Sequence, residues 1–260
     1  MSHKIKFNIK KESFSDFIEK LSDLTHIDDT IKLKIDNEHI LMYSVLGGNV
    51  MLAFKNYLIK TKEILESKEE IEYDYDIILA NSKKLVKNLN FIKDSEKITI
   101  EFNCKQSPDD ESVMNARSIQ VVGGKLKVNW LAGERYEMKD INKKVLNQRL
   151  DLKNRKWCFA LTNQEFTDVK KLSSINSDKI ININVNSGNV VLSENAAWEL
   201  EIGNIEDRNA SLILNKRFLN CINAERETIE FSMFDTFILI KDEETNLMLS
   251  YEQDFSDDDV

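Results

Sequence analysis

FIEKLSDL (residues 17–24) and FTDVKKLSSI (residues 166–175) are the two stretches that decide the fold of this chain. In both, apolar residues recur at the spacing of a helix with one buried face. Each is followed by a short gap and then by a segment in which apolar and polar residues alternate, as in a half-buried β-strand. The sequence therefore contains one helix–strand unit twice.

The repeat extends along the chain on both sides of these stretches. After an opening strand, each half is predicted to contain a helix, three strands, a bridging strand, a basic helix and three more strands. The predicted helices cover residues 12–24 and 81–93 in the first half and 164–175 and 215–224 in the second. The predicted strands are 1–11, 31–35, 40–46, 50–58, 71–79, 97–103, 118–122 and 125–131, then 157–161, 180–185, 189–193, 197–202, 211–214, 228–233, 237–241 and 247–251.

The predicted fold class is α+β, with two similar domains that each pack two helices on antiparallel sheets. The N-terminal domain is predicted at residues 1–138 and the C-terminal domain at 157–253. Residues 139–156 are polar and charged and are interpreted as a connector, and the acidic residues 254–260 as a disordered tail. A length of 260 residues is sufficient for two domains that each bury a core.

Composition narrows the class of protein. Hydrophobic residues make up 42% and charged residues 31%, as in a globular protein, and the apolar runs are too short to cross a bilayer. Cys104, Cys158 and Cys221 have no CxxC spacing, which argues against a disulfide framework and indicates a reducing compartment, the cytoplasm. The formal net charge of -9 argues against uniform affinity for nucleic acid but permits a local basic surface.

The order of elements resembles that of the DNA polymerase sliding clamps, of the proliferating cell nuclear antigen and T-even phage type. The two quoted stretches carry the resemblance, together with KVNWLAG (residues 127–133), which is similar to the end of the first domain in phage clamps. The resemblance implies a DNA clamp fold and a ring of six similar domains, hence a homotrimer around duplex DNA. It also implies a noncatalytic, virus-encoded tether for a DNA polymerase in the host cytoplasm, with a clamp loader as a further partner and no cofactor.

Three of the predicted helices present basic and amide side chains opposite their apolar faces on a helical wheel. The resemblance implies that these faces meet phosphates through weak contacts without base readout. The four helices together carry nine positive and six negative charges, a balance of +3, against -12 for the remainder of the chain. The predicted DNA-facing residues are Lys83, Lys84, Lys87, Asn90, Lys170, Lys171, Lys216, Arg217 and Asn220.

Helix 12–24 departs from this pattern. Its outward pole carries Asp16, Glu19 and Asp23, with only Lys20 nearby, so in a ring it would turn carboxylates toward phosphate. For any single helix, solvation alone also explains exposed lysines. The sequence therefore leaves the DNA-lining role of this helix open.

The resemblance also implies two protein-binding surfaces. Peptide tails of the polymerase and the loader are expected in an apolar pocket between the domains, with the candidates Val45, Leu46, Val50, Leu249 and Tyr251. Ordinary core packing is an equally good interpretation of the aliphatic members. Subunits are expected to join by pairing residues 125–131 of one chain with 196–202 of the next, with the candidates Lys125, Trp130, Ala197 and Trp198.

The motifs of common enzymes do not occur in the sequence. His3, His26 and His39 have no HxH or HExxH spacing, and neither the GxSxG nor the P-loop motif is present. Asp28 and Asp29 are interpreted as a solvated acidic turn, so we predict no enzyme and no metal site. Two alternatives stay open: an interaction adaptor of the same fold that never encircles DNA, and a carboxylate-dependent nuclease.

Overall fold

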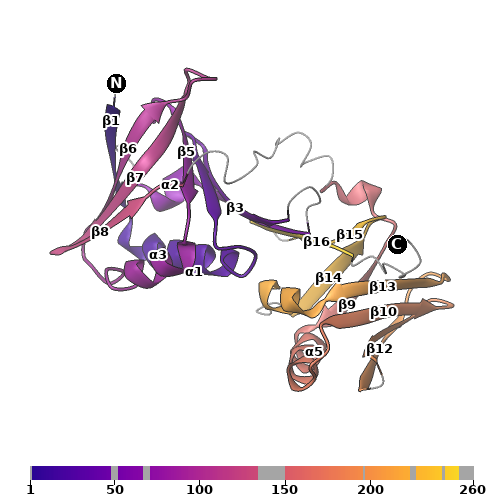
Figure 1. The fold of residues 1–260 in the computed structure, drawn as a ribbon. Coiled ribbons are helices and arrows are strands. Elements are labelled where there is room, and N and C mark those ends of the chain that lie inside the picture. The colour runs from indigo at the N-terminus through magenta and orange to yellow at the C-terminus, as the bar shows by residue number, and fades with distance from the viewer. Residues whose placement is uncertain are drawn as a thin grey trace, which may run out of the picture. The chain divides into compact units, whose positions relative to one another are not determined.

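The computed structural model describes residues 2–47, 52–66, 71–133, 150–195, 197–222, 227–241 and 244–251. Its contacts divide the chain into two units, which Figure 1 shows. Unit 1 takes in residues 1–46, 54–141 and 243–245, and unit 2 takes in residues 47–53, 142–242 and 246–260. The predicted connector up to residue 149, the predicted tail and Val50 lie outside the described residues, and the predicted domain boundaries stay predictions.

In the described residues, unit 1 combines one large sheet with three helices. The strands are β1 (Ser2–Ile9), β2 (Ile31–Ile35), β3 (His39–Leu46), β4 (Ala53–Lys60), β5 (Asp74–Leu79), β6 (Ile98–Gln106), β7 (Val113–Gly123) and β8 (Leu126–Leu131), and the helices are α1 (Lys11–Leu24), α2 (Thr61–Ile64) and α3 (Ser82–Leu89). The sheet order is β1-β6-β7-β5-β2-β3-β4, and β8 pairs with β7. The helices α1 and α3 lie side by side (Figure 1). The sequence did not predict the single turn of α2.

The strand β7 joins two antiparallel groups of strands. Its residues 113–115 pair in parallel with β5, whereas residues 118–123 pair antiparallel with β8. Between them the register against β6 shifts, so that Arg117 lies in a bulge that redirects the strand. The sequence predicts only residues 118–122 as strand, whereas β7 begins at Val113.

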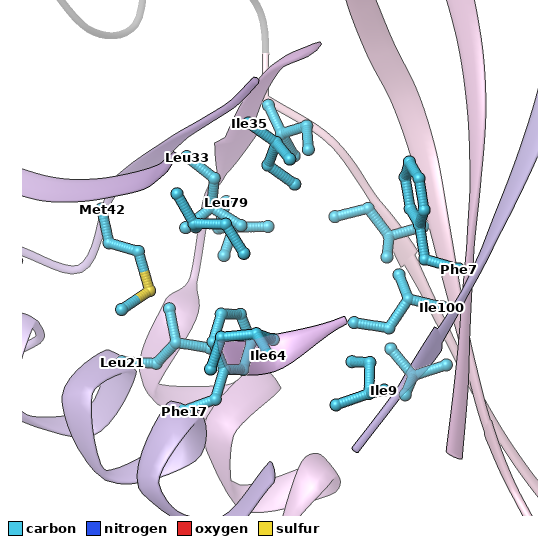
Figure 2. Close-up of a cluster of buried hydrophobic side chains, with 14 of the residues drawn as sticks. Phe7, Ile9, Phe17, Leu21, Leu33, Ile35, Met42, Ile64, Leu79 and Ile100 are labelled. Carbon is cyan, nitrogen blue, oxygen red and sulfur yellow. The ribbon is translucent and has the colours of Figure 1, made fainter. Parts of the chain in front are cut away.

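The core of unit 1 is formed by α1 and the two groups of strands. Figure 2 shows Phe17 and Leu21 of α1 and Leu33 of β2 pointing into one cluster, which Phe7 and Ile100 join from β1 and β6. The apolar residues that recur at helical spacing in 12–24 are all buried: Phe14, Phe17, Ile18, Leu21 and Leu24. Each such burial contributes roughly 1.5–3 kcal/mol. The predicted helix is confirmed, and tertiary packing stabilises it.

Unit 2 repeats this order of elements. The helices are η2 (Leu152–Asn154), α5 (Asn163–Ile175) and η3 (Lys216–Cys221), and the strands are β9 (Trp157–Thr162), β10 (Ile180–Asn186), β11 (Asn189–Glu194), β12 (Trp198–Asn204), β13 (Ala210–Asn215), β14 (Thr228–Met233), β15 (Phe237–Lys241) and β16 (Thr245–Ser250). The sheet orders are β12-β11-β10-β13 and β16-β15-β14-β9. From β9 to β16 the order matches that from β1 to β8, with α5 in the place of α1 and η3 in the place of α3. The predicted repeat is confirmed.

The second helix of unit 2 differs from its prediction. The sequence predicts a helix over 215–224, and the structure has the shorter 3-10 helix η3. Buried residues lie three apart, at Phe218 and Cys221 and at Leu219 and Ile222, which is the period of a 3-10 helix. The side chain of Asn215 caps the turn by accepting a hydrogen bond from the backbone N–H of Arg217 (3.1 Å).

The helix α5 begins with a capping box at Thr162. The Thr162 hydroxyl accepts a hydrogen bond from the Glu165 N–H (3.2 Å), and the Glu165 carboxylate accepts one from the Thr162 N–H (2.7 Å). These bonds satisfy two backbone donors that the helix leaves unpaired.

We expect Thr162→Ala to lower the free energy of unfolding by about 1 kcal/mol, because the Glu165 N–H loses its acceptor. Thermal unfolding of the variant measures this loss. Thr236→Ala, which changes an exposed turn residue, is the control. If both variants lowered the unfolding temperature equally, the capping box would not stabilise α5.

Candidate nucleic-acid interface

The helix α3 presents a row of basic side chains to solvent. Lys83, Lys84, Lys87 and Asn90 are exposed, and the opposite side of the helix is buried. Within the described ranges of the chain, none of these three lysines forms an ion pair. Asn90 donates a hydrogen bond from its side-chain amide to the carbonyl of Val86 (3.0 Å), next to the row. We call these four residues the α3 basic face.

A carboxylate from outside the helix fixes the start of α3. Asp29 accepts a hydrogen bond from the Lys83 N–H at its side chain (2.7 Å) and one from the Ser82 N–H at its carbonyl (2.9 Å). The sequence predicts Asn81 or Ser82 as the cap. Asn81 is the N-cap residue, but its side chain makes no cap bond, and the Ser82 hydroxyl donates to the carbonyl of Leu79. Asp29, interpreted from the sequence as a solvated acid, therefore orients the α3 basic face.

One carboxylate of α1 is turned into unit 1. Asp23 forms an ion pair with Lys55, whose side chain is only 1% exposed, and accepts a hydrogen bond from the Tyr57 hydroxyl (2.6 Å). Burial, followed by the nearby Asp23, raises the pKa of Tyr57, so its phenol keeps the proton that it donates. The prediction that Asp23 faces outward is wrong, because a buried lysine requires this partner.

The remaining acids of α1 are compensated in part. Lys20 forms ion pairs with Asp16 on the same helix and with Glu244 (3.3 Å). Glu19 is exposed. Asp16 and Glu19 thus remain exposed on the helix, and of the two only Asp16 is paired with Lys20.

The predicted basic residues of α5 differ in exposure. Lys171 is exposed, whereas Lys170 is half-buried with its ammonium 5.8 Å from the centre of the Phe166 ring. Such a cation–π contact holds the ammonium near the ring.

In η3, Arg217 and Asn220 are exposed, and the Arg217 guanidinium lies 5.4 Å from the centre of the Phe218 ring. Lys171, Arg217 and Asn220 are therefore the predicted DNA-facing residues of unit 2 that are exposed.

Lys216 has a different role from the one that its sequence pattern indicates. Its ammonium bonds to Glu194 (2.9 Å) and to the carbonyl of Asn176 (2.7 Å), and its side chain is 17% exposed. Glu194 is fully buried, and its other oxygen accepts a hydrogen bond from the Trp198 indole (2.9 Å). Lys216 therefore joins η3 to the turn between β11 and β12. Sequence reasoning missed Glu194, although it continues the inward series of Val190 and Leu192.

The predicted interface residues lie on or beside two edge strands. Trp130 belongs to β8 and donates a hydrogen bond from its indole to the carbonyl of Ala80 (2.8 Å), and Lys125 lies exposed in the turn before β8. Trp198 begins β12, and exposed Ala197 precedes it. Both tryptophans are half-buried, so each indole is anchored within its own unit and still reaches the surface.

The predicted pocket residues fall in different surroundings. Val45 and Leu46 are half-buried at the end of β3 in unit 1. In unit 2, Leu249 is fully buried and so belongs to the core, while half-buried Tyr251 donates a hydrogen bond from its hydroxyl to the carbonyl of Phe234 (2.9 Å). Unit 2 also has a cavity of about 490 Å³ beside the described end of the connector, lined by Leu150, Asp151, Leu152, Lys153, Lys241 and Asn246.

The described residues contain no group of three or more His, Cys, Asp or Glu side chains that could hold a metal ion. No helix among them is long and apolar enough to cross a membrane. Burial raises the pKa of the Cys104 thiol to about 11, so that this thiol is protonated at neutral pH.

No protein-family model matches the sequence, and no curated protein is similar to it. Solved structures are similar over nearly the whole chain. A proliferating cellular nuclear antigen from Entamoeba histolytica matches with 13% identity and a TM-score of 0.60, over 96% of this chain and 98% of that one. The chain has the DNA clamp fold.

Other clamp structures agree with this assignment. The PCNA2–PCNA3 complex from Sulfolobus tokodaii matches with 13% identity and a TM-score of 0.59, over 96% of this chain and 99% of that one. A putative DNA polymerase III beta subunit from Eubacterium rectale matches with 11% identity and a TM-score of 0.63, over 95% of this chain but only 65% of that one. The chain therefore has the length of the nuclear-antigen clamps and spans about two thirds of the bacterial beta subunit.

We expect Lys216→Met to destabilise unit 2 of the clamp fold by about 3 kcal/mol, because Glu194 would stay buried without its cation. Urea unfolding of Lys216→Met, Glu194→Gln and the double variant forms a cycle that isolates the pair. We expect the double variant to lose less than the sum of the two single losses. If Lys216→Met left the stability unchanged, the ion pair with Glu194 would not stabilise unit 2, and Lys216 would act only at the surface.

Proposed function

We propose that this chain is a sliding clamp, whose copies form a ring around duplex DNA and tether a replicative DNA polymerase. The observation that carries the proposal is the two-unit clamp fold, which matches a proliferating cellular nuclear antigen over 98% of that protein's length. Six such units complete the ring that the sequence resemblance implies, so three copies of this chain are required. The ring is noncatalytic and acts by topological linkage.

The α3 basic face supports contact with DNA inside such a ring. Its three lysines are exposed and make no ion pair in the described part of the chain, so they can release counterions on meeting phosphate. A ring does not need tight binding, because it cannot leave the duplex without opening. A few mobile contacts to phosphate are then sufficient. Because these contacts do not depend on the base sequence, they permit sliding.

The partners of the clamp follow from the same proposal. A clamp loader opens the ring, and peptide tails of the loader and the polymerase bind near Val45, Leu46 and Tyr251, with Val50 as a further candidate. Leu249 is left out because its side chain is buried. The similarity of residues 127–133 to phage clamps supports a virus-encoded protein that works in the host cytoplasm.

We expect light scattering to give three times the chain mass of 30.2 kDa at high protein concentration. The mass should fall on dilution, because a ring held by noncovalent contacts dissociates by mass action. A single-chain mass at every concentration would contradict the ring and favour the adaptor.

We expect the clamp to remain on linear duplex DNA at high salt only when both DNA ends are blocked by bound protein. Salt weakens phosphate contacts but does not break topological linkage. The clamp is diluted to open the ring, mixed with DNA, concentrated to close it, and then washed. Equal loss from blocked and free-ended DNA would contradict encirclement.

We expect the triple variant Lys83→Glu, Lys84→Glu and Lys87→Glu to lose retention on the blocked DNA while it keeps the trimer mass. The reversed charges repel phosphate, and the three side chains are exposed, so we expect the fold to tolerate the changes. Lys62→Glu, Lys105→Glu and Lys153→Glu together, at exposed positions on other elements, are the control of equal charge. Equal retention by the two variants would remove the α3 basic face from the mechanism.

A further inference from the structure

The sheet of unit 1 has a polar side that faces away from its helices. The strands β1, β6, β7 and β8 are neighbours in this sheet (Figure 1). Alternate side chains of these strands, such as Phe7, Phe102 and Ile119, are buried in the core together with residues of α1 and α3. The residues between them point to the opposite side of the sheet, because successive side chains of a strand alternate.

The strand register arranges these outward side chains in rows that cross the sheet. Residues directly opposite each other in an antiparallel pair share a face. Arg117 lies in the bulge between buried Ala116 and outward Ser118, and its exposure places it on the outward side. The first row is Lys4, Asn103, Ser118 and Leu131, the second is Lys6, Glu101, Gln120 and Asn129, and the third is Asn8, Thr99, Val122 and Lys127.

The outward side is basic, although the chain has a net charge of -9. Lys4, Lys6, Arg117 and Lys127 are exposed, and Glu101 is the one acid in the three rows. Lys4 forms an ion pair with Glu101 (3.2 Å) but is 72% exposed. Within the described ranges, the side chains of the other three cations form no ion pair. We call these four cations the outer basic face.

A hollow between the strands adds neutral polar groups to this face. A cavity of about 250 Å³ is lined by Lys4, Asn103, Ser118, Gln120 and Asn129, among others. Gln120 donates a hydrogen bond from its side-chain amide to the side-chain carbonyl of Asn129 (2.7 Å), and the amide group of exposed Asn129 points to no acceptor among the described residues. Ammonium, guanidinium, hydroxyl and amide donors are the side-chain groups that contact phosphate oxygens of nucleic acids.

We propose that the outer basic face binds the phosphate backbone of a nucleic acid segment other than the duplex inside the ring. The α3 basic face lies on the helix side of the core, and the sheet separates it from the outer basic face. A duplex that contacts α3 therefore does not reach the outer basic face. The site lies entirely within unit 1, so it is present in a single chain and goes beyond the proposed clamp function.

Two features favour a phosphate backbone over an acidic peptide. Leu131 is the one large apolar side chain exposed in the three rows, whereas peptide recognition generally uses several apolar anchors. The rows also contain no aromatic side chain on which a base could stack. The available contacts are charges and polar donors, so binding is independent of base sequence and is weakened strongly by salt.

An acidic turn limits the face at one end. Lys105 lies near the end of β6, and the exposed residues Asp109, Asp110 and Glu111 follow it in the turn before β7. These carboxylates repel phosphate. Lys105 is therefore a control position on the same sheet but outside the outer basic face.

Charge reversal tests the proposal. The variant Lys6→Glu with Arg117→Glu changes β1 and β7 and leaves β8 and the helices unaltered. Fluorescence anisotropy measures binding of a labelled single strand of about 20 nucleotides, and of the matching duplex, between about 50 and 200 mM salt. We expect about tenfold weaker binding at low salt and a salt slope smaller by about two, because two phosphate contacts are lost.

The controls isolate the face. Lys62→Glu with Lys105→Glu, of equal charge change at exposed positions elsewhere in unit 1, should bind more tightly than the reversal variant. The reversal is repeated in the triple variant of the α3 basic face, where it should remove the remaining binding. Circular dichroism checks folding, and Lys6→Gln with Arg117→Gln, with a smaller expected loss, replaces the reversal if that variant does not fold.

The outcomes can be told apart. Equal binding by the reversal variant and its control overturns the proposal. A loss confined to the single strand, or to the duplex, supports it and identifies the form of nucleic acid that binds. A synthetic peptide of alternating Glu and Gly is the competing probe. If this peptide binds through Lys6 and Arg117 while neither nucleic acid does, the face is a site for an acidic protein, and the proposal is overturned.

Failure of the clamp function would give a different result. A chain that is monomeric at every concentration but binds the oligonucleotides through Lys6 and Arg117 overturns the ring and supports the outer basic face. If the ring forms, the clamp retained on blocked duplex should also capture a second, labelled oligonucleotide. The reversal variant should stay on the blocked duplex and lose this capture. Retention of the wild-type clamp without capture would overturn the outer basic face alone.

Discussion

A buried lysine–carboxylate pair ties a helix to a strand in each unit. In unit 1 the pair joins Lys55 of β4 to Asp23 of α1. In unit 2 it joins Lys216 of η3 to Glu194 of β11. Desolvation offsets much of the attraction in such pairs, so we interpret them as devices that fix geometry more than stability. A hydrophobic contact could slip along the sheet, whereas a paired charge defines one position.

These pairs also decide which charges are available to a ligand. A count over the sequence treats all lysines of the helices as equal, but Lys216 is bound to Glu194 and Lys20 to Asp16 and Glu244. The lysines of α3 have no such partner among the described residues. Asp29 holds the start of that helix from a separate loop. Among the described residues, α3 thus carries three exposed lysines without an ion pair, and the start of this helix is held by a residue outside it.

The sequence predicted the repeat, the buried faces of the helices and the edge strands, because these follow from periods of 3.6 and two residues. It did not predict the 3-10 form of η3, the parallel contact of β7 or the capping role of Asp29. Each of these depends on a neighbour that is distant in the chain. The inward direction of Asp23 depends on Lys55, which lies 32 residues away in the sequence. Periodicity within the helix cannot reveal such a partner. Buried charges are therefore the residues for which pattern reasoning fails first.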